Sequence, residues 1–233
     1  MANFKSGLQT NSIKNKLTIY FISGQAADET LFENITLPSQ VTLKDVHWIE
    51  PLTHESLGNY CKRLSQQIDS NGDFVLVGVS FGGIAAIELA KILQPKQVVI
   101  ISFIATKHEL RPFLKFVRLF RIHKIVSAGF YKWYSPVLTW FFGAKTKREK
   151  ELLKTYTRLA TKNYMRWAVN EILNWENEQR PNNLFHIHGT ADRIFPYKKS
   201  KADILINDGT HFMVHNRANE ISKILTERLN AFS

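Results

Sequence analysis

Cysteine is almost absent from this chain of 233 residues, in which Cys61 is the only one. A single cysteine cannot form an internal disulfide, and a chain without disulfides is typical of reducing compartments. We therefore expect a cytoplasmic protein. Cys61 falls in a predicted helix, and its neighbours in the sequence do not suggest an activated thiol, so we interpret it as a small packing residue.

Long apolar runs are missing as well. No segment reaches the roughly 18 or more uninterrupted apolar residues of a membrane-spanning helix, and the segment Met1–Lys16 is polar, without the apolar core of a secretory signal. The sequence also contains no internal repeat. These absences favour a globular protein, and the length is sufficient for one α/β domain with a sizeable core and an insertion.

Aspartate is absent from the stretch Ala105–Asn183, whose composition differs from that of the rest of the chain. This stretch holds 16 of the 31 lysines and arginines against 6 glutamates, so it carries +10 of the net charge of +11. It also contains 14 of the 28 aromatic residues, and its apolar pattern is helical. We predict a helical, basic and aromatic-rich cap over residues 105–183, inserted into a core formed by residues 1–104 and 184–233.

Short apolar segments alternate with helical patterns in the remainder of the chain. Strands are predicted at 17–22, within 41–49, and at 74–77, 97–102, 184–188 and 203–206, and helices at 55–68, 83–90 and 218–229. This alternation is typical of an α/β fold with a mostly parallel sheet covered by helices on both faces. Ligands bind such sheets at the carboxyl ends of the strands, where the cap would lie.

The stretch Gly78-Val79-Ser80-Phe81-Gly82 connects one predicted strand to the following helix. A serine in a sharp strand-to-helix turn, with glycines two residues before and after it, is typical of a nucleophile elbow. The glycines are needed because a side chain at either position would collide with the neighbouring strand or helix. By itself the pattern also fits a tight glycine-rich turn in any parallel-sheet protein.

A nucleophilic serine needs a base, and the base needs a third group that orients it. His211 lies between the last predicted strand and the last helix, and Asp192 follows the preceding strand. Both residues would therefore lie at the same end of the sheet as Ser80. Asp208, a turn residue close to His211, is the alternative orienting acid, and we favour Asp192 because it follows a strand directly.

In this order of serine, aspartate and histidine, the sequence resembles the α/β-hydrolase superfamily. Residues 78–83 resemble its nucleophile elbow, residues 189–196 (Gly-Thr-Ala-Asp-Arg-Ile-Phe-Pro) its acid loop, and residues 209–213 (Gly-Thr-His-Phe-Met) its histidine loop. The resemblance covers nearly the whole chain outside 105–183. It implies an α/β-hydrolase fold and a serine hydrolase with Ser80, Asp192 and His211 as the catalytic triad.

The resemblance also implies an oxyanion hole made of two backbone N–H groups. Phe81 supplies one of them, and the loop after the first strand supplies the other, from Gln25 by family position, with Ala26 as the alternative. Neither a cofactor nor a metal is expected. His186 and His188 lie within a predicted strand, and no spacing of carboxylates or cysteines supports a metal site that includes them.

These residues predict hydrolysis of a carboxylic ester or thioester through a Ser80 acyl-enzyme, and the aromatic cap favours an apolar group in the small-molecule substrate. Two alternatives remain open: a lyase or C–C bond hydrolase on the same fold, and a membrane-docking or binding module. The second depends on Pro112–Val126, where aromatic and basic residues alternate in a way that suits an anionic membrane. Nucleic acid is not an expected partner, because no binding motif accompanies the charge.

Overall fold

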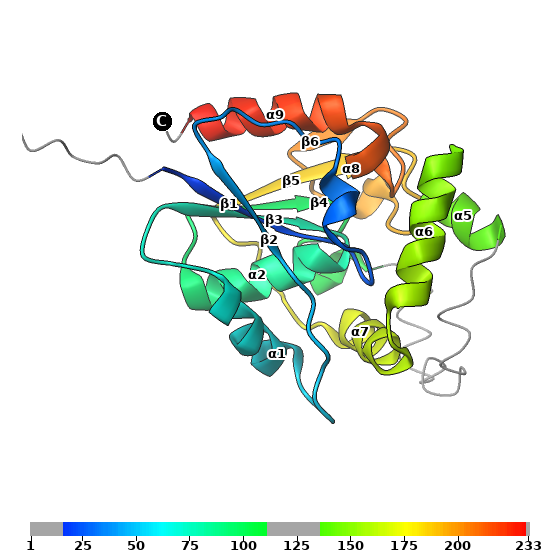
Figure 1. The fold of residues 1–233 in the computed structure, drawn as a ribbon, viewed down its shortest axis with the longest axis horizontal. Coiled ribbons are helices and arrows are strands. Elements are labelled where there is room, and N and C mark those ends of the chain that lie inside the picture. Colours follow the sequence, from blue (N-terminus) through cyan, green and yellow to red (C-terminus); the bar gives the residue numbers. More distant parts are fainter. Residues whose placement is uncertain (1–15, 111–135, 232–233) are drawn as a thin grey trace, which may run out of the picture.

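The computed structural model describes residues 16–110 and 136–231. Its centre is a sheet of six strands in the order β2-β1-β3-β4-β5-β6, and all neighbouring strands are parallel (Figure 1). The strands are β1 (Thr18–Ile22), β2 (Thr42–Val46), β3 (Phe74–Val79), β4 (Gln97–Ile101), β5 (Leu184–Gly189) and β6 (Ile204–Ile206). The predicted α/β class and parallel sheet are confirmed.

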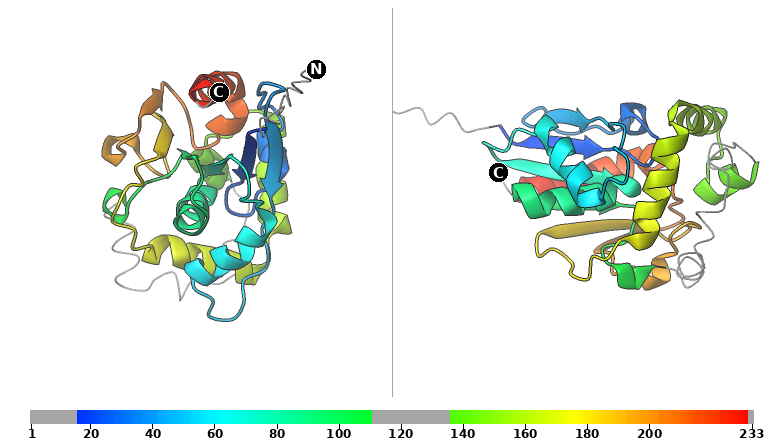
Figure 2. Two further views of the ribbon diagram at one scale, coloured as in Figure 1. Left: turned by 90° about the vertical axis from the view of Figure 1, so that its left-hand side faces the viewer. Right: turned by 90° about the horizontal axis from the view of Figure 1, so that it is seen from below.

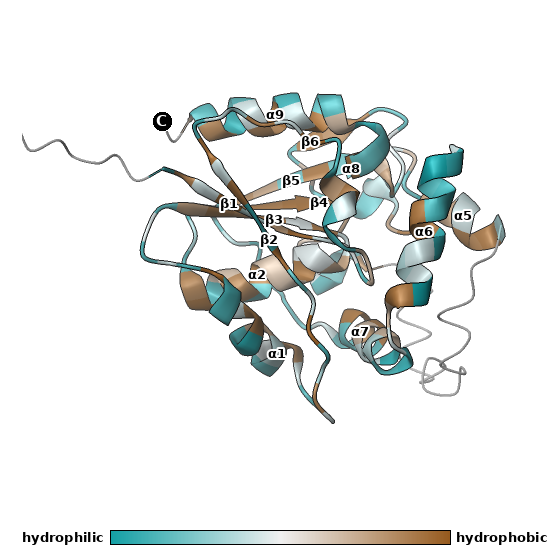
Figure 3. Ribbon diagram, viewed as in Figure 1, coloured by the Kyte–Doolittle hydropathy of each residue, from teal (hydrophilic) through white to brown (hydrophobic). Residues whose placement is uncertain are grey.

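Helices cover both faces of the sheet. α1 (Leu57–Leu64) and α2 (Phe81–Leu93) lie on one face, and the short α8 (Met213–Asn216) and α9 (Ala218–Asn230) lie on the other (Figures 1 and 2). The helices turn their apolar sides toward the sheet and their polar sides outward (Figure 3). No helix in the described part of the chain is long and apolar enough to cross a bilayer.

Side chains of the strands alternate between two apolar layers, as the pleat requires. In β1, Tyr20 and Ile22 pack with α1 and α2, whereas Ile19 and Phe21 pack with α9. Because both faces are covered, every residue of β3 is buried, which explains why this strand is a continuous apolar run in the sequence. Cys61 of α1 is fully buried in the first layer and acts as the packing residue that was predicted.

Three α-helices follow β4 in the described part of the predicted cap: α5 (Pro136–Phe142), α6 (Lys147–Leu159) and α7 (Lys162–Asn174). They lie beyond the carboxyl ends of the strands (Figure 1). Threonines begin two of them: Thr146 accepts a hydrogen bond from the Glu149 N–H in a capping box, and Thr161 accepts one from Tyr164. The segment Pro112–Val126, on which the membrane-docking alternative depends, lies outside the described residues.

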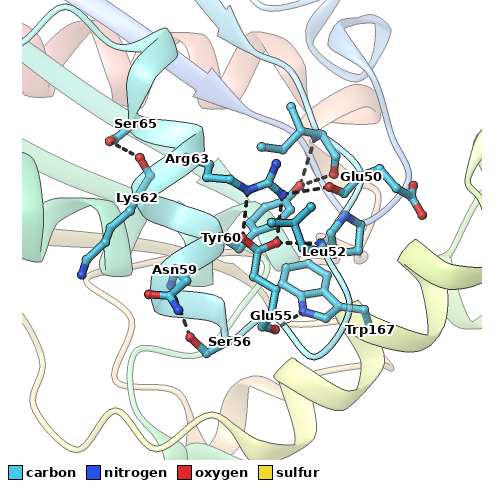
Figure 4. Close-up of polar contacts among 12 residues, drawn as sticks. Glu50, Leu52, Glu55, Ser56, Asn59, Tyr60, Lys62, Arg63, Ser65 and Trp167 are labelled. Carbon is cyan, nitrogen blue, oxygen red and sulfur yellow. Dashed lines mark hydrogen bonds and ion pairs between the residues drawn. The ribbon is translucent and has the colours of Figure 1, made fainter.

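The helix α7 is attached to the core through Trp167. Its indole Nε1 donates a hydrogen bond of 2.7 Å to the Glu55 carbonyl, and its ring packs against Tyr60 with centroids 4.3 Å apart (Figure 4). The Glu55 carboxylate in turn forms an ion pair with Arg63, with 2.8 Å between Oε1 and Nε. This attachment fixes α7 at the end of the sheet where the predicted site residues lie.

Candidate active site

Ser80 is the single residue between β3 and α2. Its backbone has φ 53° and ψ −122°, a region that residues other than glycine rarely occupy. Its N–H donates to the Ile101 carbonyl of the adjacent strand at 2.9 Å, which anchors the turn. A strained serine between a strand and a helix is the geometry of a nucleophile elbow, and it holds the hydroxyl at the carboxyl end of the sheet.

The two glycines of this turn leave no room for a side chain. A Cβ atom on Gly78 would collide with the backbone of Gly82, and one on Gly82 would collide with the carbonyl oxygens of Ile22 and Ser23. The elbow therefore packs against its own helix on one side and against the end of β1 on the other. This contact is the steric reason for both glycines.

Replacing Gly82 by alanine should destabilise the fold. The added Cβ atom must displace the end of β1, and overpacking of this kind lowers the free energy of unfolding by about 1–3 kcal/mol. Gly58→Ala is the matched control, because no atom lies within 4 Å of its added Cβ atom and alanine favours the helix α1. Urea unfolding measures both variants, and equal stability of the two would contradict this account of the elbow.

The structure brings the three side chains predicted from the motifs into one hydrogen-bonded series. His211 Nε2 lies 3.0 Å from Ser80 Oγ, and His211 Nδ1 lies 2.8 Å from Asp192 Oδ2. His211 and Asp192 are both buried. A carboxylate can only accept, so Nδ1 carries the proton of the neutral imidazole, and Nε2 is left free to accept the serine proton.

Asp192 is held in its own loop by backbone donors. Its Oδ1 accepts hydrogen bonds from the N–H groups of Ile194 at 2.8 Å and Phe195 at 2.9 Å. Burial opposes ionisation, but His211 and the backbone donors outweigh it and hold the pKa of Asp192 below its ordinary value. The alternative acid, Asp208, is exposed in a turn, whereas Asp192 is the hydrogen-bond partner of His211 Nδ1.

Two further histidines lie behind the acid loop and are fully buried in β5. His188 Nε2 donates to the Phe195 carbonyl at 2.6 Å, so its Nδ1 accepts from His186 Nε2 at 3.2 Å. Burial, with smaller contributions from the neighbouring His188 and Arg180, lowers the pKa of His186 to about 3. Burial also lowers the pKa of His188. Both are hydrogen-bonded strand residues, as predicted, and no cluster of three potential metal ligands is found among the described residues.

This histidine pair should make stability depend on pH. Between about pH 6.5, where an unfolded histidine titrates, and about pH 3, His186 binds a proton only in the unfolded chain. The fold therefore loses stability as the pH falls through this range. Relative to His186→Phe, the wild type should lose about 2 kcal/mol of unfolding free energy between pH 7 and pH 5, because the slope approaches about 1.4 kcal/mol per pH unit only below pH 6.5. Urea unfolding at pH 7, 6 and 5 tests this, and equal slopes would contradict it.

The loop after β1 lies beside the serine. It forms a β-turn in which the Ala27 N–H donates to the Gly24 carbonyl at 3.0 Å, and Ala26 has a φ of 66°. A Cβ atom on Gly24 would lie 3.5 Å from Ser80 Cβ. No hydrogen bond among the described residues uses the N–H groups of Gln25 or Phe81, the two groups expected to form the oxyanion hole.

A cavity of about 530 Å³ opens beside Ser80 and His211. Its wall is mostly apolar. About half of the wall comes from the three α-helices between β4 and β5, with Val137, Leu138 and Phe141 from α5, Leu153 from α6, and Met165, Val169 and Ile172 from α7. The sequence did not single out these residues. Helical periodicity shows which face of a helix is apolar, but it does not show what that face contacts.

No protein-family profile matches the sequence, and no curated protein matches it either. Solved structures do match. MGS-M2, an alpha/beta hydrolase enzyme from a Medee basin deep-sea metagenome library, is 15% identical, with a TM-score of 0.65 over 93% of this chain and 90% of its own. A thermophilic esterase from Thermogutta terrifontis is 14% identical, with a TM-score of 0.61 over 92% and 90%. A lipase-esterase related protein from Clostridium acetobutylicum is 14% identical, with a TM-score of 0.62 over 92% and 95%.

These similarities extend over nearly the whole length of each chain, and at such low identity they concern the fold. They agree with the all-parallel sheet of six strands and the helices on its two faces. The expectation drawn from the three sequence motifs is thereby confirmed at the level of architecture. The chain has the α/β-hydrolase fold.

Proposed function

We propose that the protein is a serine hydrolase that cleaves a carboxylic ester or thioester with an apolar group. The observation that carries the proposal is the hydrogen-bonded series from Ser80 through His211 to Asp192, placed at the edge of an apolar cavity. The esterase and lipase-related names of similar structures support ester chemistry. The substrate is a small molecule, and the reaction needs no cofactor.

In the proposed reaction, His211 Nε2 accepts the proton of Ser80 as its Oγ attacks the substrate carbonyl carbon. The resulting tetrahedral oxyanion accepts hydrogen bonds from the N–H groups of Phe81 and Gln25. Collapse expels the alcohol or thiol, which takes the proton from His211, and leaves an acyl group on Ser80. Water then attacks the acyl carbon by the same route, with His211 as base, and releases the carboxylic acid.

The surroundings favour each charge that forms during this reaction. Asp192 is ionised and buried beside His211, so its negative charge stabilises the imidazolium with little screening by solvent. Removal of one oxyanion donor typically costs roughly 3–4 kcal/mol of transition-state stabilisation. Phe81 is the first residue of α2, so the positive end of the helix dipole adds to its N–H at this place.

We further propose that residues 105–183 act as a cap that selects the substrate. The described part of this stretch supplies α5, α6 and α7, and these helices form about half of the cavity wall. An acyl chain would bury its methylenes against side chains such as Leu138 and Val169. Each buried methylene contributes on the order of 0.8 kcal/mol.

Chain length should therefore change the efficiency of the enzyme strongly. Four additional methylenes between an acetyl and a hexanoyl ester should raise kcat/KM by about tenfold or more if part of their binding is realised in the transition state. Labelling with a fluorophosphonate, followed by p-nitrophenyl esters of graded length, tests both proposals. Absence of labelling would contradict the serine hydrolase, whereas equal efficiency on acetyl and hexanoyl esters would contradict only the cap.

A further inference from the structure

The carboxyl-terminal turn of α5 lies directly against the loop that carries His211. The Phe142 carbonyl accepts a hydrogen bond of 3.1 Å from the N–H of Phe212, the residue after His211. The Phe142 ring meets the imidazole of His211 edge to face, with 5.1 Å between the centroids and 88° between the planes. One residue of α5 therefore contacts both the backbone of the histidine loop and the imidazole itself.

Gly143 brings this turn into contact with the residue before His211. It ends α5 with a φ of 72°, and its N–H donates to the Thr139 carbonyl at 3.0 Å. A Cβ atom at this position would collide with the side chain of Thr210. Glycine is thus required by the backbone conformation and by the close approach to the histidine loop.

The same turn is also joined to the acid loop. Arg193, the residue after Asp192, donates to the Trp140 carbonyl at 2.7 Å, and its guanidinium lies 4.2 Å from the centre of the Trp140 ring. An arginine over an indole is a favourable cation–π pair. The end of α5 is therefore attached to both loops that carry the predicted partners of Ser80.

We propose that the end of α5 is a positioning element: Trp140 and Gly143 attach it to the acid and histidine loops, and Phe142 holds the His211 imidazole in its productive orientation. This inference rests on the proposed role of His211 as the base. Rotation of the imidazole would break the hydrogen bond to Ser80, to Asp192 or to both. Phe142 packs against the ring at 5.1 Å and Phe195 packs against it at 5.8 Å, so two aromatic rings restrict that rotation.

The position of Phe142 also connects substrate binding to the base. Phe142 lines the cavity together with Leu138 and Phe141 of the same helix. An acyl chain that packs against this helix would hold its last turn against the histidine loop. A well-fitting chain is therefore expected to raise kcat as well as to lower KM.

Phe142→Leu tests the positioning role, because leucine keeps the residue apolar but removes the flat ring. Edge-to-face pairs contribute about 0.5–1.5 kcal/mol, which corresponds to a fall in kcat of roughly two- to tenfold on a hexanoyl ester. KM should change little, and the low-field proton resonance of His211 Nδ1–H should broaden in the free enzyme. Phe142→Tyr keeps the ring and should restore both measurements.

Phe141→Leu is the matched control from the same helix and cavity. Phe141 lines the cavity, and its ring packs edge to face with Trp140 at 5.0 Å. Its replacement should therefore change KM and leave the His211 resonance sharp. If Phe142→Leu changes KM alone and its His211 resonance stays sharp, the residue is only a wall of the cavity and the proposal is overturned.

Two further measurements keep the test decisive. Should Phe142→Leu fail to fold, Arg193→Gln loosens the same turn from the acid loop. A lower kcat and a broader resonance in that variant support the proposal, and unchanged values overturn it. The resonance is recorded without substrate, so it tests the contact with α5 even if absence of fluorophosphonate labelling contradicts the hydrolase activity.

Discussion

Ser80→Ala is expected to abolish labelling by a fluorophosphonate and to lower ester hydrolysis by about four to six orders of magnitude. The proposed reaction needs the Ser80 oxygen to form the acyl-enzyme, and the partners of a triad act as a unit, so His211 and Asp192 cannot compensate for its loss. The fold should persist, because alanine removes only a hydroxyl whose hydrogen-bond partner is His211. Labelling and steady-state kinetics measure the two effects.

Ser102→Ala is the matched control for this variant. Ser102 also follows a strand directly, and its φ of 56° is close to that of Ser80, but its side chain is fully buried. This variant should keep its labelling and its turnover. Retained labelling in Ser80→Ala, or lost labelling in Ser102→Ala accompanied by a stable fold, would contradict the assignment of the nucleophile.

The sheet could be predicted from the sequence because its strands are buried on both faces. Every residue of β3 is buried, whichever face of the sheet it points to, so the whole strand is apolar and stands out against the polar turns. The helices α2 and α9 were predicted from their helical patterns, which are amphipathic in α9, with ends within a few residues of those observed. The helix predicted over 55–68 is shorter, because α1 ends at Leu64 and continues as a 3-10 turn.

The candidate site could be predicted because its residues lie in three short motifs at the ends of strands. Parallel strands bring their carboxyl ends to one edge, so Ser80 after β3, Asp192 after β5 and His211 after β6 had to lie close together. The glycines in these motifs are also visible in the sequence, and the structure gives a steric reason for them. Gly189, at the end of β5, leaves no room for a side chain beside Gly209.

The contacts of α5 could not be predicted from the sequence. Phe142 and Gly143 belong to a stretch with many aromatic and basic residues, and nothing in its pattern distinguishes the residue that meets His211 from its neighbours. Such contacts depend on how the helix is placed on the core, which local periodicity does not determine. The hydrogen bond from His186 to His188 is a similar case, since both were recognised as strand residues without their mutual contact.

Asp192→Asn is expected to lower kcat by about 10⁴-fold while the fold is retained. The amide oxygen can still accept the N–H groups of Ile194 and Phe195, so the loop keeps its hydrogen bonds. The amide nitrogen then faces His211 Nδ1 and donates to it. The imidazole must carry its proton on Nε2, where it faces Ser80 and cannot accept the serine proton.

Asp208→Asn provides the control for this substitution, because Asp208 is the other aspartate close to His211 in the sequence. It is exposed, and asparagine tolerates its φ of 54° well, so turnover should stay near that of the wild type. The Asp192→Asn protein should also lose the low-field resonance of His211 Nδ1–H, since that proton moves to Nε2. Full activity in Asp192→Asn would contradict the orienting role of Asp192. A large loss of activity in Asp208→Asn would assign that role to Asp208 instead.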